Sequence, residues 1–223
     1  MAYQFDFAAL SEYSGVLAKG VGLTVTLIGI GGTLGVAVGI AGAWARGFSG
    51  IRALEVAVAA YVELIRNTPF LIQLFFIFFG LPTLGVKLTE VQAAILAMVV
   101  NLGAYATEII RAGVAAVARG QVEAGVSLAM TRLQVFRHVV LRPALAKIWP
   151  ALTSQMVIVM FGSAVCSQIA VEELTFAANF IQSRNFRAFE TYFVVTGMYL
   201  VLALLLRQLL RGLGAWLVFG RRA

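Results

Sequence analysis

The chain has 223 residues, of which 61% are hydrophobic and only 12% are charged, and its mean hydropathy is +0.93. This apolar content exceeds what the core of one soluble domain can bury, so it indicates an integral membrane protein. The net charge of +7 does not indicate nucleic-acid binding, because the cations lie in interhelical loops and at helix ends. A single cysteine, Cys166, excludes an intrachain disulfide and a cysteine metal cluster.

The N-terminal segment, residues 1–19, has neither a basic n-region nor a cleavage site. We expect it to be a retained amphipathic segment on the periplasmic side, followed by a transmembrane domain over 20–223. Five apolar stretches approach the roughly 20 residues that a membrane-crossing helix needs. The sequence therefore predicts an all-α membrane protein with about five transmembrane helices, at 20–44, 53–81, 91–110, 148–171 and 189–206.

The Lys and Arg distribution predicts the orientation of these helices. Twelve cations lie on the side that holds the long loop between the third and fourth stretches and the C-terminus, and four lie on the other side. Arg66 is left out because it lies within a stretch. Since cytoplasmic loops are enriched in Lys and Arg, we expect the N-terminus outside and the C-terminus inside the cell.

The first apolar stretch carries Gly31, Gly35 and Gly39 at four-residue spacing, continued by Ala43. Small residues spaced in this way form a groove that lets another helix approach closely in lipid. Packing within the chain and contact with a second subunit both fit this pattern.

The second stretch contains Pro69, which cannot donate a backbone hydrogen bond and crowds the preceding turn, so the helix should kink or break near Asn67. Glu63, Arg66 and Gln73 lie close to one helical face. A charge deep in the bilayer costs about 2.5–3.5 kcal/mol, so these groups must face protein, water or each other. Arg66 could pair with Glu63 or Glu108 to hold helices together, or the broken helix could border a translocation pathway.

The third stretch carries a polar stripe, Asn101, Tyr105 and Glu108, on one helical face. These groups supply hydrogen-bond donors and acceptors that suit a zwitterionic solute. Alternatively, Asn101 and Tyr105 bond neighbouring helices and Glu108 pairs with a nearby arginine. The fourth stretch adds Gln155 and Ser163 as pathway candidates.

The loop over 113–147 is predicted to hold two short helices, at 120–128 and 132–140. Small side chains and one carboxylate, at Glu123, Ala124 and Gly125, would face outward there. Such a surface could enter a groove on a partner protein, although a solvated loop without a partner has the same pattern.

Three segments in order resemble one known family. They are Tyr61 to Pro82 (YVELIRNTPFLIQLFFIFFGLP), Tyr105 to Gly113 (YATEIIRAG) and Gly120 to Ala151. They resemble the permease subunits of polar amino acid ABC importers of the histidine/glutamine/glutamate type, which have the type I importer fold. The resemblance implies a multi-pass protein of the bacterial inner membrane that pairs with a copy or paralogue of itself.

The same resemblance implies partners. An ATPase subunit that holds ATP and Mg would dock on the coupling loop at Glu123, Ala124 and Gly125, with Leu128 and Ala129 behind them, and a soluble binding protein would deliver the amino acid. This chain departs from the family pattern at Gly125, Ala129 and Arg142. If position 129 needs a left-handed backbone, alanine costs about 1 kcal/mol relative to glycine.

The sequence contains no G-x-x-x-x-G-K-[ST] phosphate loop and no metal-ligand or nucleophile arrangement around its one histidine. We therefore expect a chain that is not itself an enzyme, has no cofactor or metal of its own and takes energy from elsewhere. The main alternative is a secondary transporter with Glu63, Arg66 and Glu108 as an ion relay. A membrane scaffold without transport activity is a third interpretation.

Overall fold

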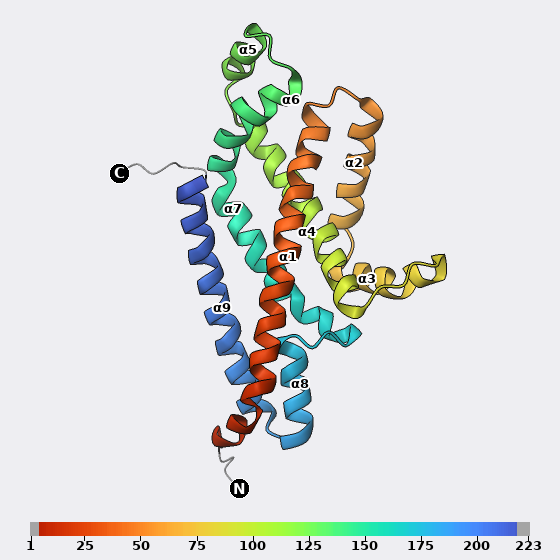
Figure 1. The fold of residues 1–223 in the computed structure, drawn as a ribbon, viewed down its shortest axis with the longest axis vertical. Coiled ribbons are helices and arrows are strands. Elements are labelled where there is room, and N and C mark those ends of the chain that lie inside the picture. The colour runs from red at the N-terminus through yellow and green to blue at the C-terminus, as the bar shows by residue number, and fades with distance from the viewer. Residues whose placement is uncertain (1–4, 218–223) are drawn as a thin grey trace.

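The computed structural model describes residues 5–217, and this part of the chain is helical without strands (Figure 1). Residues 1–4 of the N-terminal segment, and the cations Arg221 and Arg222, lie outside the described residues. The α-helices are α1 (Ser14–Gly47), α2 (Arg52–Arg66), α3 (Phe70–Phe75), α4 (Glu90–Ala115), α5 (Arg119–Ser127), α6 (Arg132–Gln134), α7 (Leu141–Gly162), α8 (Leu174–Asn185) and α9 (Ala188–Leu217). Short 3-10 or π-helical segments are η1 (Ala8–Tyr13), η2 (Phe76–Gly80), η3 (Leu81–Leu84), η4 (Val135–Val140) and η5 (Ser163–Ile169).

Within residues 5–217, four helical segments are long and apolar enough to cross a membrane, and the bent α2–α3 pair makes a fifth if it is counted as one span. The predicted all-α membrane fold is thus confirmed. The α1–α2 connection, the α5–α6 loop and the C-terminal end of α9 lie toward one end of the molecule, whereas α8 and the N-terminal end lie at the other (Figure 1). The cation-rich segments therefore share one end, and their placement in the cytoplasm stays a prediction.

The glycine groove of α1 packs against α4 of the same chain. A Cβ on Gly35 would lie 2.8 Å from the Cβ of Leu102, and one on Gly39 would collide with Ala106. Because these positions lack side chains, the two helix backbones approach closely, which is how helices gain van der Waals contact in lipid. Intrachain packing, one of the two interpretations of this motif, is what the structure contains. Fully buried Leu27, Met98 and Met160 continue the core between α1, α4 and α7.

Two segments differ from the predicted elements. The second loop helix and the fourth apolar stretch form one continuous helical segment from Arg132 to Ile169. Pro143 has no N–H to donate to the preceding turn, and the wider π turn of η4 lies directly before it. The helix α8 was not predicted, because its 12 residues are too short to cross a bilayer. It is held against α1, where the backbone N–H of Leu174 donates to Thr24 Oγ1 at 3.2 Å.

Candidate functional site

The break between α2 and α3 begins the site. Pro69 has extended backbone torsions, φ −64° and ψ 138°, and the paired segments are bent by 112°, as the proline predicts. Such a break leaves backbone carbonyls without helical partners at membrane depth. The amide nitrogen of Gln73 donates to Ile65 O at 2.8 Å, to Thr68 O at 3.0 Å and to Thr68 Oγ1 at 2.9 Å. Gln73 therefore stabilises the broken backbone.

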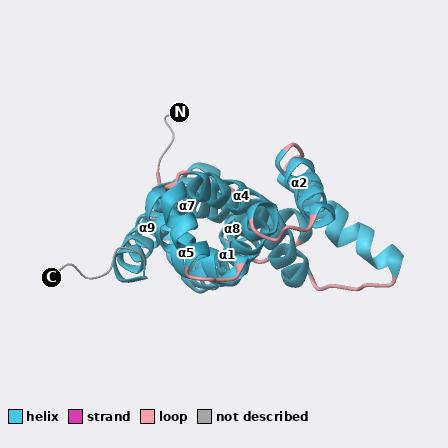
Figure 2. Cartoon of the chain, turned by 90° about the horizontal axis from the view of Figure 1, so that it is seen from above, coloured by secondary structure: helices cyan, strands magenta, loops and turns pink. Residues whose placement is uncertain are grey.

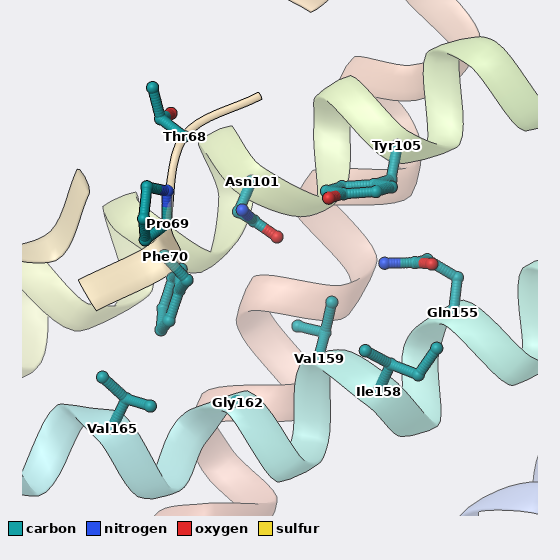
Figure 3. A pocket seen from close by; sticks show the side chains of 10 residues that line it. All are labelled: Thr68, Pro69, Phe70, Asn101, Tyr105, Gln155, Ile158, Val159, Gly162 and Val165. Carbon is teal, nitrogen blue, oxygen red and sulfur yellow. The ribbon is translucent and has the colours of Figure 1, made fainter. Parts of the chain in front are cut away.

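Asn101 on α4 is connected to this break. Its Nδ2 donates to Gln73 Oε1 at 2.9 Å, so the two side chains form one short hydrogen-bond chain between α4 and the break. Gln73 is only 8% exposed, whereas Asn101 is half-buried at the edge of a cavity. The Asn101 oxygen points into that space (Figure 3).

The cavity has a volume of about 470 Å³ and lies between the break, α4 and α7. Asn101, Tyr105 and Gln155 supply polar groups that come from opposite walls, and the rest of the lining is apolar or small (Figure 3). A concave apolar site with a few convergent polar groups is typical of small-molecule binding. Its lining residues are Thr68, Pro69, Phe70, Asn101, Tyr105, Gln155, Ile158, Val159, Gly162 and Val165.

Arg66 reaches this site by stacking on Tyr105. Its guanidinium carbon lies 5.5 Å from the centroid of the Tyr105 ring, a cation–π contact. Within residues 5–217 Arg66 forms no ion pair with Glu63 or Glu108. In place of the predicted ion pairs, Arg66 makes an aromatic contact with Tyr105, which lines the cavity.

Glu108, by contrast, has strong partners. Its carboxylate accepts from Arg46 at the end of α1 at 3.0 Å, and from Arg111 one turn along α4, where Nε lies 3.0 Å from Oε1. Because both arginines are charged, Glu108 ties the ends of α1 and α4 together. The predicted pairing of Glu108 with a nearby arginine is thus present with Arg111, and Arg46 is a second partner that was not predicted.

Two further predicted pathway residues lie outside the cavity lining. Glu63 is exposed and accepts from Asn67 Nδ2 at 3.1 Å, and Ser163 is fully buried with its hydroxyl donating to Met160 O at 2.6 Å. Their roles in a pathway stay predictions. Thr68, Phe70 and Gly162 line the cavity although they were not predicted as pathway residues. Thr68 and Phe70 flank Pro69, so the predicted break is the signal for them, whereas Gly162 follows Gln155 by seven residues and shares its helical face.

The loop between α4 and α7 forms the second part of the site. Helix α5 ends in a Schellman cap: Ala129 N–H donates to Val126 O at 2.9 Å and Met130 N–H to Gly125 O at 3.2 Å. Ala129 has φ 55°, so the position does adopt the left-handed backbone that favours glycine. Gly125 is buried, and a Cβ there would lie 3.1 Å from Val135 Cγ2. Gly125 therefore packs against η4 and does not face outward as expected, and its part in coupling stays a prediction.

Three of the other coupling candidates face outward, whereas Val117 and Val135 of the same loop are buried. Glu123, Ala124 and Leu128 are exposed, and Leu128 is 77% exposed although it is apolar. The loop projects beyond the transmembrane helices at one end of the molecule (Figure 1). It is tied back to the bundle, because Lys147 on α7 donates to the carbonyl of Ala116.

Two sites have been described on this all-α fold: a polar cavity beside a broken helix, and an exposed loop. Together they are typical of a membrane permease. Residues 31–217 match the family model described as "Binding-protein-dependent transport system inner membrane component". The chain belongs to this family, and it is the permease component of a binding-protein-dependent ABC importer for amino acids.

Individual relatives support the same class. The chain is 34% identical over 212 residues to the glutamine transport system permease protein GlnP of Escherichia coli (strain K12), covering 94% of this chain and 96% of the relative. It is 36% identical over 170 residues to the L-cystine transport system permease protein TcyB of Bacillus subtilis (strain 168), covering 76% of this chain and 72% of the relative.

Solved structures give the same fold. A crystal structure of an amino acid ABC transporter with histidines matches with a TM-score of 0.83 and 34% identity, covering 99% of this chain and 100% of that chain. An inward-facing structure of the MetNI methionine ABC transporter matches with a TM-score of 0.74 at 21% identity, covering 89% of this chain and 96% of that chain, which shows the fold alone.

Proposed function

We propose that this chain is the membrane-spanning subunit of an ATP-driven importer that moves a polar amino acid across the bacterial inner membrane. Its relatives include glutamine and L-cystine permeases, and both of these solutes are polar amino acids. In this proposal a second permease subunit, the same or a paralogue, completes the pathway. A periplasmic or extracellular binding protein delivers the solute, and ATP and Mg are held by a separate ATPase subunit.

The observation that carries the proposal is the anchored, outward-facing α5 loop. Packing of Gly125 on Val135 and the Schellman cap at Ala129 hold α5 against the start of the α6–α7 segment. The segment from Arg132 to Ile169 is continuous and carries Gln155 of the cavity. A push on Glu123 by a closing ATPase would therefore move α7 at the cavity without an intervening flexible joint.

The cavity fits a small zwitterion. The oxygen of Asn101 accepts from an ammonium, whereas the Tyr105 hydroxyl and the Gln155 amide donate to a carboxylate. The guanidinium of Arg66 adds a charge at the edge of the same space. The alternative ion relay lacks such support, because Glu108 is paired with two arginines and Glu63 bonds to Asn67.

The coupling step is tested by Glu123→Arg in the complex reconstituted with its ATPase and binding protein. We expect uptake and binding-protein-stimulated ATP hydrolysis to fall about tenfold or more, because a charge is reversed in a docked interface. Glu12→Arg is the matched control, since Glu12 is an exposed carboxylate on η1 at the other end of the molecule. Unchanged uptake and ATPase stimulation in Glu123→Arg would overturn the coupling role.

The pathway role of the cavity is tested by Tyr105→Phe, which removes one hydroxyl without changing the packing. We expect a higher KM for uptake and unchanged thermal stability. Tyr61→Phe is the control: its hydroxyl donates to Val100 O at 2.6 Å outside the cavity, so we expect lower stability and an unchanged KM. A KM that does not respond to Tyr105→Phe would remove Tyr105 from the pathway.

A further inference from the structure

A second polar cavity, of about 330 Å³, lies between α7 and α9. It is separate from the pathway cavity. Thr153, which lines it, is two residues from Gln155 and therefore about 200° away around α7. Helices α2 and α9 also lie on opposite sides of the central α1, α4 and α7 group (Figure 2). Nothing in the proposed import pathway uses this boundary between α7 and α9, which we call the α7–α9 seam.

The walls of the cavity are suited to an anion. Arg207 and Arg211 are exposed and one turn apart on α9, and Thr153 and Ser154 face them from α7. Within residues 5–217 neither arginine has an ion-pair partner and no acidic side chain lines the cavity. Thr153 is 7% exposed, and its hydroxyl makes no hydrogen bond within the same residues. Two guanidinium forks and a free hydroxyl are the groups that hold a phosphate.

The position of the two helices at this cavity is fixed by Trp149. Its indole Nε1 donates to the carbonyl of Leu210 at 2.9 Å, and the ring lies against Gly214, where a Cβ would collide with it. The indole therefore holds α7 and α9 in register and sets the spacing between the hydroxyls and the arginines. Trp side chains are also enriched at the level of lipid headgroups.

An apolar cavity follows the cationic one along the α7–α9 seam. This mostly apolar space of about 430 Å³ lies along α7, η5 and α9, and it is lined by Phe161, Ala164, Thr196, Tyr199 and Leu200. The Tyr199 hydroxyl is already bonded to Glu173. Leu200 precedes Arg207 by seven residues, or about 10 Å along the helix axis. A cationic cavity followed by an apolar one at this spacing matches a headgroup and its acyl chain, whereas a soluble anion would use only the first.

We propose that the α7–α9 seam binds one anionic phospholipid, with its phosphate between Arg207, Arg211 and Thr153 and an acyl chain against Phe161 and Leu200. Basic pockets between transmembrane helices bind anionic lipid headgroups in this way. The site is specific to the lipid's charge, because the arginines supply the attraction and the apolar groove accepts any chain.

The test measures lipid retained by the full chain, purified from nanodiscs that contain equal parts phosphatidylglycerol and phosphatidylcholine, by native mass spectrometry. We expect Arg207→Gln or Arg211→Gln to lower phosphatidylglycerol retention about fivefold, and the double variant about thirtyfold, with phosphatidylcholine unchanged. Thr153→Val should lower it with both arginines intact. Arg52→Gln is the control, because it removes an exposed arginine at the same end of the molecule, outside the seam.

Equal phosphatidylglycerol retention in the double variant and the parent chain would overturn the proposal. So would displacement of the bound lipid by millimolar inorganic phosphate, which would identify the occupant as a soluble anion. A double variant that changes the number of chains per particle and not the bound lipid would identify the seam as a protein contact, and would overturn the proposal as well.

Discussion

Gln73 is expected to hold the broken α2–α3 backbone in place, and Gln73→Met tests this. Methionine has a similar length and no donor, so the change removes the bonds from Gln73 to Ile65 O and Thr68 and leaves Asn101 Nδ2 without its acceptor. A buried carbonyl that loses its partner costs about 1–3 kcal/mol. Because the neighbouring cavity admits water to some of these groups, we expect a loss of about 2 kcal/mol in total.

This loss corresponds to a local opening equilibrium that is about thirtyfold more favourable. Hydrogen-exchange mass spectrometry of the chain in nanodiscs measures it, because the amides just after Pro69 should exchange faster by that factor while those in α1 do not change. Gln168→Met is the control, since Gln168 is exposed and forms no side-chain hydrogen bond among the described residues. If the backbone amides of residues 70–75 exchange at the same rate in Gln73→Met and in the parent chain, the stabilising role of the Gln73 side chain is refuted.

Two further changes probe the packing and the loop. Gly39→Ala should lower the free energy of unfolding by about 1–3 kcal/mol, because the added methyl group overpacks against Ala106. Thermal unfolding in detergent measures this, and Gly29→Ala is the control because the space around Gly29 is open. Equal melting temperatures for the two variants would contradict the α1–α4 contact. Ala129→Gly should stabilise the α5 cap by about 1 kcal/mol, because glycine adopts the left-handed backbone of position 129 without strain. We expect slower amide exchange over residues 119–127. Faster exchange there would show that Ala129 is not strained.

The sequence predicted the parts of the fold that depend on local physics. Apolar length located the spans and Pro69 located the break, and both features follow from residues that are neighbours in the chain. The left-handed backbone at Ala129 was anticipated only through the family resemblance, from which the chain departs at this position. The helix α8 and the merged segment from Arg132 to Ile169 depend on tertiary packing, so they were not predicted.

The candidate site was predicted less completely, because partners distant in sequence decide each side chain's role. Asn101, Tyr105 and Gln155 do line one cavity, as polar stripes on facing helices suggest. Gln73 also lies on the predicted face, but its amide is used by the backbone break. Glu108 binds Arg46, which lies 62 residues away, and no spacing rule connects these two positions.

We expect this chain to transport an amino acid only when a separate ATPase drives it. The most direct measurement is uptake of labelled polar amino acids, glutamine and L-cystine among them, into proteoliposomes that contain this chain with its partner permease, ATPase and binding protein. We predict uptake that requires ATP and the ATPase subunit and that does not respond to an imposed proton or sodium gradient. Uptake driven by such a gradient in the absence of ATP would contradict the account.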